Sequence, residues 1–362
     1  MYNIGKEGDF SRGGTPMRRM GLKWLQPGMV LERPVYGKGG RILLDKGITL
    51  KESYIRRLAD FGVSHVYVYD ERLAEIIIDD VVNEETRLEA AEIVKEAVDN
   101  IRFGKELKAE VIKQAVTEII DEILDNRDAL FHLSELRIAG ENLFHHSVTV
   151  TIYSILTGLT INYHKEDLLK LGTGALLHDI GKSRIPEWIG PGYEAMKNHT
   201  VYGFEILRRD RDFSLLEAHV AYQHHELFDG SGYPRQLKGR NIHEFARITA
   251  IANTYDALVT GLYEKKLLPY QAIEYITAQA GGAFDPELAR VFSTNIVVYP
   301  LGSLVRLNTG DKGFVVKIPK NYPTRPVVRI IKDSMQRKYR KNFPEIDLMK
   351  ELTVFIEDVI EE

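Results

Sequence analysis

The sequence predicts a mainly α-helical protein in which a helical core stands between a small α/β module and a small β-rich appendage. Three observations lead to this fold class. Apolar residues recur at three- and four-residue spacing from residue 71 to about 296. Short β-like runs separated by turn residues lie before and after that region. Ten of the 11 histidines fall between His132 and His243, inside the helical region.

Length and composition bound the class of protein. The chain has 362 residues, enough for two or three domains with their own cores. A charged fraction of 28% and a net charge of −4 give no reason to expect a nucleic-acid polymer as partner. Because the chain has no cysteine, only His, Asp, Glu or Asn side chains could hold a metal. No apolar run approaches the roughly 20 residues that span a bilayer, so we expect no membrane contact and a cytoplasmic location.

The N-terminal region divides into a tail and a module. Residues 1–20 are rich in Gly, Arg and Lys without periodicity, so we expect a disordered tail. Residues 21–70 combine short β-like runs with one helix from about Glu52 to Phe61, which indicates a small α/β accessory module. Its one histidine, His65, stands among β-forming residues, and nothing in the module points to catalysis.

Residues 71–130 form a predicted helical connector. They are strong helix formers with apolar positions at helical spacing, for example Val111, Ala115 and Ile119. We expect one or two long helices divided at Gly104. The connector could carry a homodimer interface or pass on a signal, but packing against the following domain explains its apolar positions equally well.

The run His178-Asp179-Ile180-Gly181-Lys182 combines a nitrogen ligand, a carboxylate and a cation within five residues. The apolar run before it predicts that His178 and Asp179 stand at the end of a buried helix, which Gly181 breaks. A buried carboxylate beside a histidine needs a compensating cation. An adjacent His-Asp pair is by itself also typical of a capped helix end, so further ligands have to decide between the two interpretations.

Further candidate ligands occur on other predicted helices of the same region. Helical bundles build metal sites from side chains that project inward from facing helices, and an aspartate between two histidine sets can bridge two metal ions. A glycine-rich loop, residues 229–234, follows the last histidine pair. The candidates outside the first motif are His145, His146, His199, His224, His225, Asn253 and Asp256.

These motifs resemble the HD-GYP family, the branch of the HD phosphohydrolases that linearises bacterial cyclic dinucleotides. The resemblance runs from about residue 131 to 296. The flanking module and the appendage of residues 297–362 are similar to regions that accompany the family, with much less specific motifs. The motifs that carry the resemblance are His146-Ser147, Leu176 to Lys182 with Ile185-Pro186, Met196 to His199 with Gly203, His224 through Pro234, Leu237-Lys238-Gly239, and Arg247-Ile248 before Tyr255 to Leu258.

The resemblance implies an HD-type catalytic domain over residues 131–296 that hydrolyses cyclic di-GMP to pGpG, GMP or both. Two divalent metal ions are implied as cofactors, iron or manganese with zinc as the alternative, since nitrogen ligands with a carboxylate suit these metals. By the family pattern, His146, His178, Asp179 and Asn253 would hold one metal, and Asp179, His199, His224 and His225 the other.

The same resemblance implies roles in catalysis and substrate binding. Asp179 would bridge the metals, and Lys182 would neutralise charge on the phosphoryl oxygens. The loop residues Gly232, Tyr233 and Pro234 would shape the substrate cleft. Where the family usually has a substrate-binding arginine, this chain has Leu262, so the expected cationic contact is Lys265.

Two departures from the family pattern motivate an alternative function. Asn253 stands where the family has an aspartate ligand, which predicts weaker binding of the first metal, and Leu262 replaces the substrate-binding arginine. A third departure, Asn142 in place of a carboxylate that enables a third metal in some members, predicts two metals and not three, although Glu141 lies beside it. The alternative is a degenerate domain that binds a cyclic dinucleotide or a partner protein without turnover. We expect Asp256 to form a hydrogen bond, Glu226 to orient a histidine, and structural positions outside the metal site for His132, His145, His164, His219 and His243.

Overall fold

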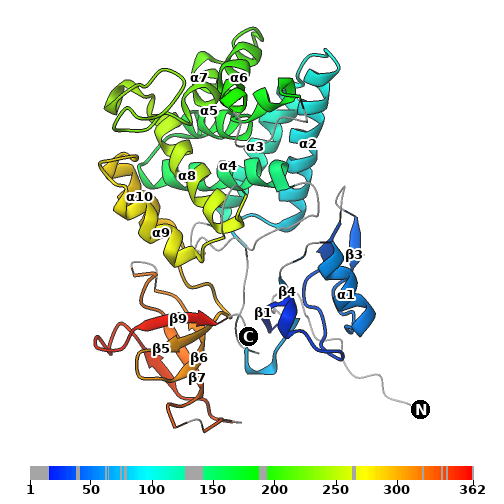
Figure 1. Cartoon of the computed structure of the whole chain (residues 1–362), viewed down its shortest axis with the longest axis vertical. Coiled ribbons are helices and arrows are strands. Elements are labelled where there is room, and N and C mark those ends of the chain that lie inside the picture. Colours follow the sequence, from blue (N-terminus) through cyan, green and yellow to red (C-terminus); the bar gives the residue numbers. More distant parts are fainter. Residues whose placement is uncertain are drawn as a thin grey trace, which may run out of the picture.

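The computed structural model describes residues 16–37, 41–61, 63, 65–73, 76, 80–126, 142–186, 194–262, 266–319, 322–335, 337–339 and 341–360. A helical domain forms one end of the molecule, and an N-terminal α/β module and a C-terminal sheet lie at the other end (Figure 1). This arrangement confirms the predicted fold class. None of the helices in the described ranges is long and apolar enough to cross a membrane.

The N-terminal module contains the expected helix and short strands. Its first strand begins at Met17, so the prediction of a disordered tail is wrong for residues 17–20, and residues 1–15 lie outside the described residues. That strand pairs with one that follows far along the chain, with Met17 opposite Tyr69, and this nonlocal pairing leaves no local sequence signal. The elements are β1 (Met17–Gly21), β2 (Val35–Tyr36), β3 (Ile42–Leu44), α1 (Glu52–Asp60) and β4 (His65–Tyr69).

Two long helices follow, α2 (Glu84–Arg102) and α3 (Ala109–Asp125). The expectation of helix before residue 84 is wrong for the described residues 80–83, because the Asn83 side chain caps α2 by accepting a hydrogen bond from the Thr86 backbone N–H at 2.9 Å. Gly104, with φ of +69°, lies in the turn between the helices, as predicted.

The connector helices belong to the core of the helical domain. Apolar residues of α2 and α3, including Val94, Val116 and Ile119, form one buried cluster with residues of the helices after residue 142. This finding favours the packing explanation of the connector over a free interface, and the boundary predicted at residue 131 divides a single core. The helices that complete this cluster are α4 (Asn142–Thr160), α5 (Lys165–Leu176), α6 (His199–Leu207) and α7 (Leu215–Gln223).

A second buried cluster lies on the other side of α4 and α5. It includes Ile248, Ile251 and Phe292 and joins these helices to the last helices of the domain. The core side chains of two clusters therefore fix the helices that carry the histidine motifs. The added helices are α8 (Glu244–Thr260), α9 (Pro269–Ala278) and α10 (Pro286–Asn295).

The C-terminal region is a five-stranded antiparallel sheet in the order β8-β7-β6-β5-β9. Leu304 and Phe314 of this sheet share a buried cluster with Met17 and Tyr67 of the N-terminal module, so the two small units pack together. The sequence also predicts an acidic strand and a short helix from Asp347 to Glu362, but the described residues 345–360 form strands and turns. The strands are β5 (Leu304–Leu307), β6 (Lys312–Lys317), β7 (Val327–Lys332), β8 (Glu345–Asp347) and β9 (Ile356–Ile360).

Asp80 joins the N-terminal module to α2. Its Oδ2 atom accepts hydrogen bonds from Arg33 of the module and from Arg87 of α2, both at 2.7 Å. The side chains of Asp80 and Arg87 are buried, with exposed fractions of 5% and 4%. The start of α2 is therefore fixed to the module by a buried ion-pair network, whose charges are stable there only while each has its partner.

Candidate metal centre

Asp179 lies in a turn between a long helix and a short one. Helix α5 ends at Leu176, and after a turn the 3-10 helix η4 covers Ile180–Arg184. The prediction that Gly181 breaks a helix at this point is wrong, since Gly181 lies within η4. A Cβ at Gly181 would overlap the backbone of His199 and Gly203, so the glycine allows η4 and α6 to touch. This close approach brings Asp179 beside His199.

One group of potential ligands consists of His146, His178 and Asp179. Each offers a nitrogen or oxygen atom within 4.8 Å of the others, and all three side chains are buried. The Nδ1 atom of His178 lies 2.7 Å from the Ala175 carbonyl oxygen. Because that nitrogen donates its proton to the carbonyl, Nε2 carries the lone pair and lies 3.4 Å from Asp179 Oδ2.

His146 is held between two polar residues of α8. Its Nδ1 lies 2.6 Å from Asp256 Oδ2, and its Nε2 lies 2.9 Å from Asn253 Oδ1. Asp256 thus orients the ring by a hydrogen bond, as expected, and Asn253 lies next to the nitrogen that would bind a metal. Asp256 and Asn253 therefore lie at the two different nitrogens of the His146 ring, and Asn253 is on the side of the other candidate ligands.

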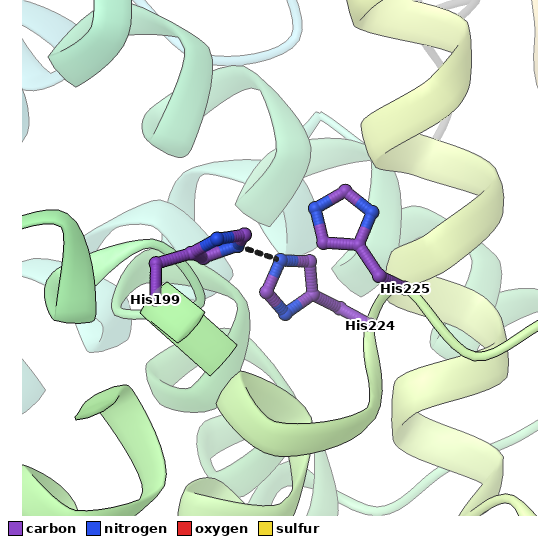
Figure 2. Close-up of side chains that lie close together, drawn as sticks. All are labelled: His199, His224 and His225. Carbon is purple, nitrogen blue, oxygen red and sulfur yellow. Dashed lines mark hydrogen bonds between the residues drawn. The ribbon is translucent and has the colours of Figure 1, made fainter. Parts of the chain in front are cut away.

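The second group consists of His199, His224 and His225, which converge from α6 and the end of α7 (Figure 2). The Nε2 atoms of His199 and His224 lie 3.2 Å apart. Their Nδ1 atoms lie 2.6 Å from Met196 O and 3.0 Å from Ala221 O, so both rings donate from Nδ1 and carry a lone pair at Nε2. Two facing lone pairs at this distance repel each other unless they share a cation.

Asp179 lies between the two groups. Its Oδ2 faces His178, whereas its Oδ1 lies 3.3 Å from His199 Nε2 and 3.8 Å from His224 Nε2. Asp179 Oδ1 and His178 Nε2 are buried without a hydrogen-bond partner within the described part of the chain. Buried polar atoms are normally satisfied, so these two point to a missing ligand. The donor set and its orphaned atoms fit divalent metal ions, with Asp179 as the shared ligand.

The electrostatics keep the candidate ligands in the forms that bind metals. Burial lowers the pKa of His199 to about 4 and, together with the neighbouring histidines, lowers the pKa of His224 and His225 well below the ordinary value. Burial alone would raise the pKa of Asp179, but Lys182 and His178 outweigh it and hold that pKa well below its usual range. The imidazoles of His199, His224 and His225 are therefore neutral and the Asp179 carboxylate is ionised near pH 7.

Lys182 stands directly beside the shared carboxylate. Its Nζ atom donates to Asp179 Oδ2 at 2.5 Å, and 14% of its side chain is exposed. The lysine comes from η4, one turn after Asp179, so the same short helix presents the carboxylate and its counter-charge. A cation in this position can also reach an anionic group bound at the centre.

The predicted substrate loop packs against the second group. The Tyr233 ring stacks on His225 with 4.7 Å between centroids and 16° between planes, and the Tyr233 N–H donates to His225 O at 3.1 Å. A Cβ at Gly232 would overlap backbone atoms of Leu227 and His225, so this glycine permits the close turn before Pro234. The loop residues Gly232, Tyr233 and Pro234 thus lie beside the candidate ligands.

Glu226 does not orient a histidine, contrary to our expectation. Its two carboxylate oxygens accept hydrogen bonds from the backbone N–H groups of Arg235 and Leu237, at 2.7 and 2.9 Å. Glu226 is buried, and it stabilises the loop that carries Tyr233.

The other sequence-based candidates lie outside the two groups or outside the described residues. His145 is buried but belongs to neither group, His219 packs against Phe204, and His243 caps α8. Leu262 is partly buried. The predicted substrate contact Lys265 falls outside the described residues, as do His132 and Glu141, and the side chain of Asn142 is not described.

Sequence reasoning missed Lys197. Its Nζ atom lies 5.4 Å from the centroid of the Tyr233 ring, next to the second group of histidines. The available signal was its place in the motif Met196 to His199, two residues before a candidate ligand.

Two family models match the chain. Residues 120–288 match a model described as an HD domain, and residues 304–362 match one described as a KOW domain associated with HD domain. The second match coincides with the C-terminal sheet.

Several curated proteins are similar in sequence. Cyclic di-GMP phosphodiesterase PA4108 of Pseudomonas aeruginosa is 32% identical over 226 residues, which cover 60% of this chain and 54% of that protein. A cyclic di-GMP phosphodiesterase of Thermotoga maritima is 42% identical over 128 residues, 33% of this chain and 35% of that protein. The 3'3'-cGAMP-specific phosphodiesterase 2 of Vibrio cholerae is 32% identical over 204 residues, 53% of this chain and 36% of that protein. The chain thus spans about half or less of the length of these relatives.

A solved structure shares the fold. Bd1817, a HDG"Y"P protein from Bdellovibrio bacteriovorus, aligns with a TM-score of 0.51 and 18% identity over 76% of this chain and 98% of that chain. At this identity the likeness concerns the fold alone. The family match over residues 120–288, the named relatives and the ordered motifs agree with one another, and on these grounds this part of the chain is an HD domain that resembles the HD-GYP branch.

Proposed function

We propose that this protein is a metal-dependent phosphodiesterase that hydrolyses cyclic di-GMP to pGpG, GMP or both. The observation that carries the proposal is the position of Asp179 between two groups of histidines, with orphaned polar atoms on Asp179 and His178. Relatives named cyclic di-GMP phosphodiesterases and 3'3'-cGAMP-specific phosphodiesterases support a cyclic dinucleotide as the substrate class.

The proposed metal ligands are His146, His178, Asp179 and Asn253 on one side and Asp179, His199, His224 and His225 on the other. When bound, the ions would act as Lewis acids toward a phosphoryl oxygen and would lower the pKa of water. Iron or manganese is the proposed metal, with zinc as the alternative, because imidazole nitrogens dominate the donor set.

The chain's own residues bind and stabilise the reacting phosphate. Lys182 lies at hydrogen-bond distance from Asp179, so its ammonium group can neutralise charge that grows on the phosphoryl oxygens during hydrolysis. The histidines and the ionised Asp179 stay in place because the core and backbone carbonyls hold them. Gly232, Tyr233 and Pro234 form the wall against which the substrate is held, and we keep Lys265 as a proposed substrate contact.

Location and assembly are part of the proposal. Cyclic di-GMP is a bacterial second messenger, so we place the reaction in the cytoplasm. A homodimer through the connector helices is also proposed, with exposed Phe103 and Val111 as the apolar side chains that the core leaves available. Sedimentation velocity of wild-type protein and of Phe103→Ser would test it, and a monomer at every concentration would remove the dimer.

A turnover assay tests the proposed activity. Protein purified under reducing conditions and loaded with Fe²⁺ or Mn²⁺ is incubated with cyclic di-GMP, and the products are separated by anion-exchange chromatography. We expect pGpG or GMP from wild-type protein and none from His178→Ala. Unchanged cyclic di-GMP with protein that metal analysis shows to be loaded would contradict the proposal.

A second candidate is a domain that binds a cyclic dinucleotide or a partner protein without turnover. The observation that favours it is the neutral Asn253, whose amide oxygen lies 2.9 Å from His146 Nε2 in place of a charged ligand. Isothermal titration with cyclic di-GMP separates the candidates, since tight binding with no product in the turnover assay identifies this second function.

A further inference from the structure

We infer that Lys197 binds the phosphate of the substrate that is not cleaved, so that the site selects ligands with two phosphodiester groups. This inference rests on the proposed function. It assigns the role to a lysine outside the expected set of substrate-binding residues, and it depends on the placement of that lysine beside the second histidine group.

The backbone of Lys197 is fixed to the metal centre. The 3-10 helix η5 (Glu194–Asn198) leads directly into α6, and Met196 O accepts a hydrogen bond from His199 Nδ1 at 2.6 Å. The next carbonyl, that of Lys197, accepts from Thr200 Oγ1 at 3.0 Å. These bonds hold the Lys197 backbone beside a candidate ligand, whereas its side chain is 48% exposed and can reach a bound molecule.

The side chain of Lys197 directs its charge toward the substrate loop. Its Nζ atom lies 5.4 Å from the Tyr233 ring centroid, and that ring stacks on His225. An ammonium group over an aromatic ring is stabilised by the ring without being neutralised, so it keeps its charge for an anion. The Tyr233 ring therefore lies beside both the charge of Lys197 and the ring of His225 of the second group.

The anion that now pairs with Lys197 is easily replaced. Glu194 Oε2 lies 2.8 Å from Lys197 Nζ, but the glutamate side chain is 83% exposed. An ion pair between exposed side chains contributes little free energy, because water screens both charges. A phosphate held by other contacts can take the place of the carboxylate.

Lys182 and Lys197 differ in burial, which suits them to bind two different phosphates. Lys182 is 14% exposed and bonded to Asp179, which suits the phosphate at the metal centre, whereas Lys197 lies nearer the surface beside Tyr233. A cyclic dinucleotide carries two phosphodiester groups in one ring, so when one is at the centre the other has to lie outside it. Lys197 lies beside the Tyr233 ring, where that second phosphate would be held.

The test compares Lys197→Met with Lys170→Met, which removes a lysine from a similar surface pair. Lys170 lies 2.7 Å from Glu166 on α5 and has no part in the centre. For Mn²⁺-loaded protein, we measure KM and kcat with cyclic di-GMP and with bis(p-nitrophenyl) phosphate, a diester that has one phosphate. Titration calorimetry gives the Kd of cyclic di-GMP, and metal analysis gives the metal content.

Loss of a charge-assisted contact predicts about a tenfold or larger rise in KM and Kd for cyclic di-GMP in Lys197→Met. We expect unchanged kcat, unchanged metal content and unchanged kcat/KM for bis(p-nitrophenyl) phosphate, and wild-type values for Lys170→Met. Glu194→Gln should lower the Kd, since it removes the competing carboxylate. Equal losses on both substrates, or no change in either, would overturn the inference.

The design separates this inference from the proposed function. Hydrolysis by wild-type protein with an unaffected Lys197→Met variant overturns the inference alone. If wild-type protein binds cyclic di-GMP without hydrolysing it, the proposed activity is wrong. The Kd of Lys197→Met relative to that of wild-type protein then decides the inference. If wild-type protein neither binds nor cleaves cyclic di-GMP, both are wrong.

Discussion

The carboxylate of Asp256 lies 2.6 Å from Nδ1 of His146 and turns the other nitrogen of the ring toward Asn253, 2.9 Å away. Both residues come from α8, one helical turn apart, and they hold the same ring from its two sides. A charged residue thus orients the histidine, and a neutral one lies on the proposed metal-binding side. The next two predictions follow from this division.

Asp256→Asn should weaken metal binding without unfolding the domain. The amide can no longer hold His146 as a charged acceptor, so affinity at the first metal position should fall by about 10- to 100-fold. Competition with a metallochromic chelator measures this affinity, and the second position should be unaffected. Thr254→Val on the same helix, which loses only a bond to Ala250 O, is the control. Equal affinity in Asp256→Asn and wild-type protein would show that Asp256 does not position His146.

Asn253→Asp should raise occupancy of the first metal position. A carboxylate adds a negative charge next to His146, whereas the amide oxygen offers none. Turnover should rise more at limiting metal than at saturating metal, because the substitution acts on binding. Metal stoichiometry and initial rate against metal concentration measure both effects. If neither changes at any concentration, Asn253 is not a ligand.

His178→Ala and Lys182→Ala should separate metal binding from rate. His178→Ala removes a buried ligand atom and should lose metal and activity together. Lys182→Ala should retain metal, since the lysine lies beside Asp179 as a cation and offers no ligand, and its rate should fall by about 100-fold or more. Metal analysis of both variants beside a single-turnover assay gives the comparison. Equal metal loss would mean that Lys182 supports the centre and not the substrate.

Gly181→Ala should disrupt the contact between η4 and α6. A Cβ there meets backbone atoms of His199 and Gly203, which cannot move aside as a flexible side chain can. We expect a loss of about 1–3 kcal/mol in the free energy of unfolding, and lower metal content because Asp179 and His199 separate. Gly282→Ala is the control, since the atoms nearest its Cβ are 3.5 Å away. Similar melting curves for the two variants would contradict this view of Gly181.

Asp80→Asn should destabilise the junction between the N-terminal module and α2. It removes the carboxylate that lies 2.7 Å from the buried Arg87, and breaking a buried ion pair typically costs about 3–5 kcal/mol. Chemical denaturation followed by circular dichroism measures the change. Asp121→Asn is the comparison, because Asp121 pairs with Lys165 where both side chains are at least half exposed, so its loss should have almost no effect. Equal stability of the two variants would contradict the assigned role of Asp80.

Periodicity predicted the helical region and its flanking units because each helix buries one face in a common core. It failed at the first strand, where the deciding contact is nonlocal, and at the start of α2. Met17–Gly21 form a strand because β4 lies beside them, and the composition of the tail gives no sign of it. The start of α2 was predicted too early because apolar residues at helical spacing already occur before Asn83, the residue that caps the helix.

The order of motifs predicted the histidine groups, and the structure brings their members together. The rest of the site depended on contacts that spacing cannot show. Glu226 has the spacing of a residue that orients a histidine, yet its carboxylate binds backbone N–H groups within the loop. Lys197 was missed because Tyr233 reaches it from a loop that follows a different helix.

Because α2 and α3 share a core with the later helices, the segment needed for folding is longer than the segment that carries the candidate ligands. A fragment that began at residue 131, or at residue 120 within α3, would leave apolar faces of α4 and α5 bare to water. Any transplantation of this domain onto another module therefore has to carry α2 and α3 with it. Its natural graft point is the charged junction at Asp80, where a new module would have to supply its own arginine.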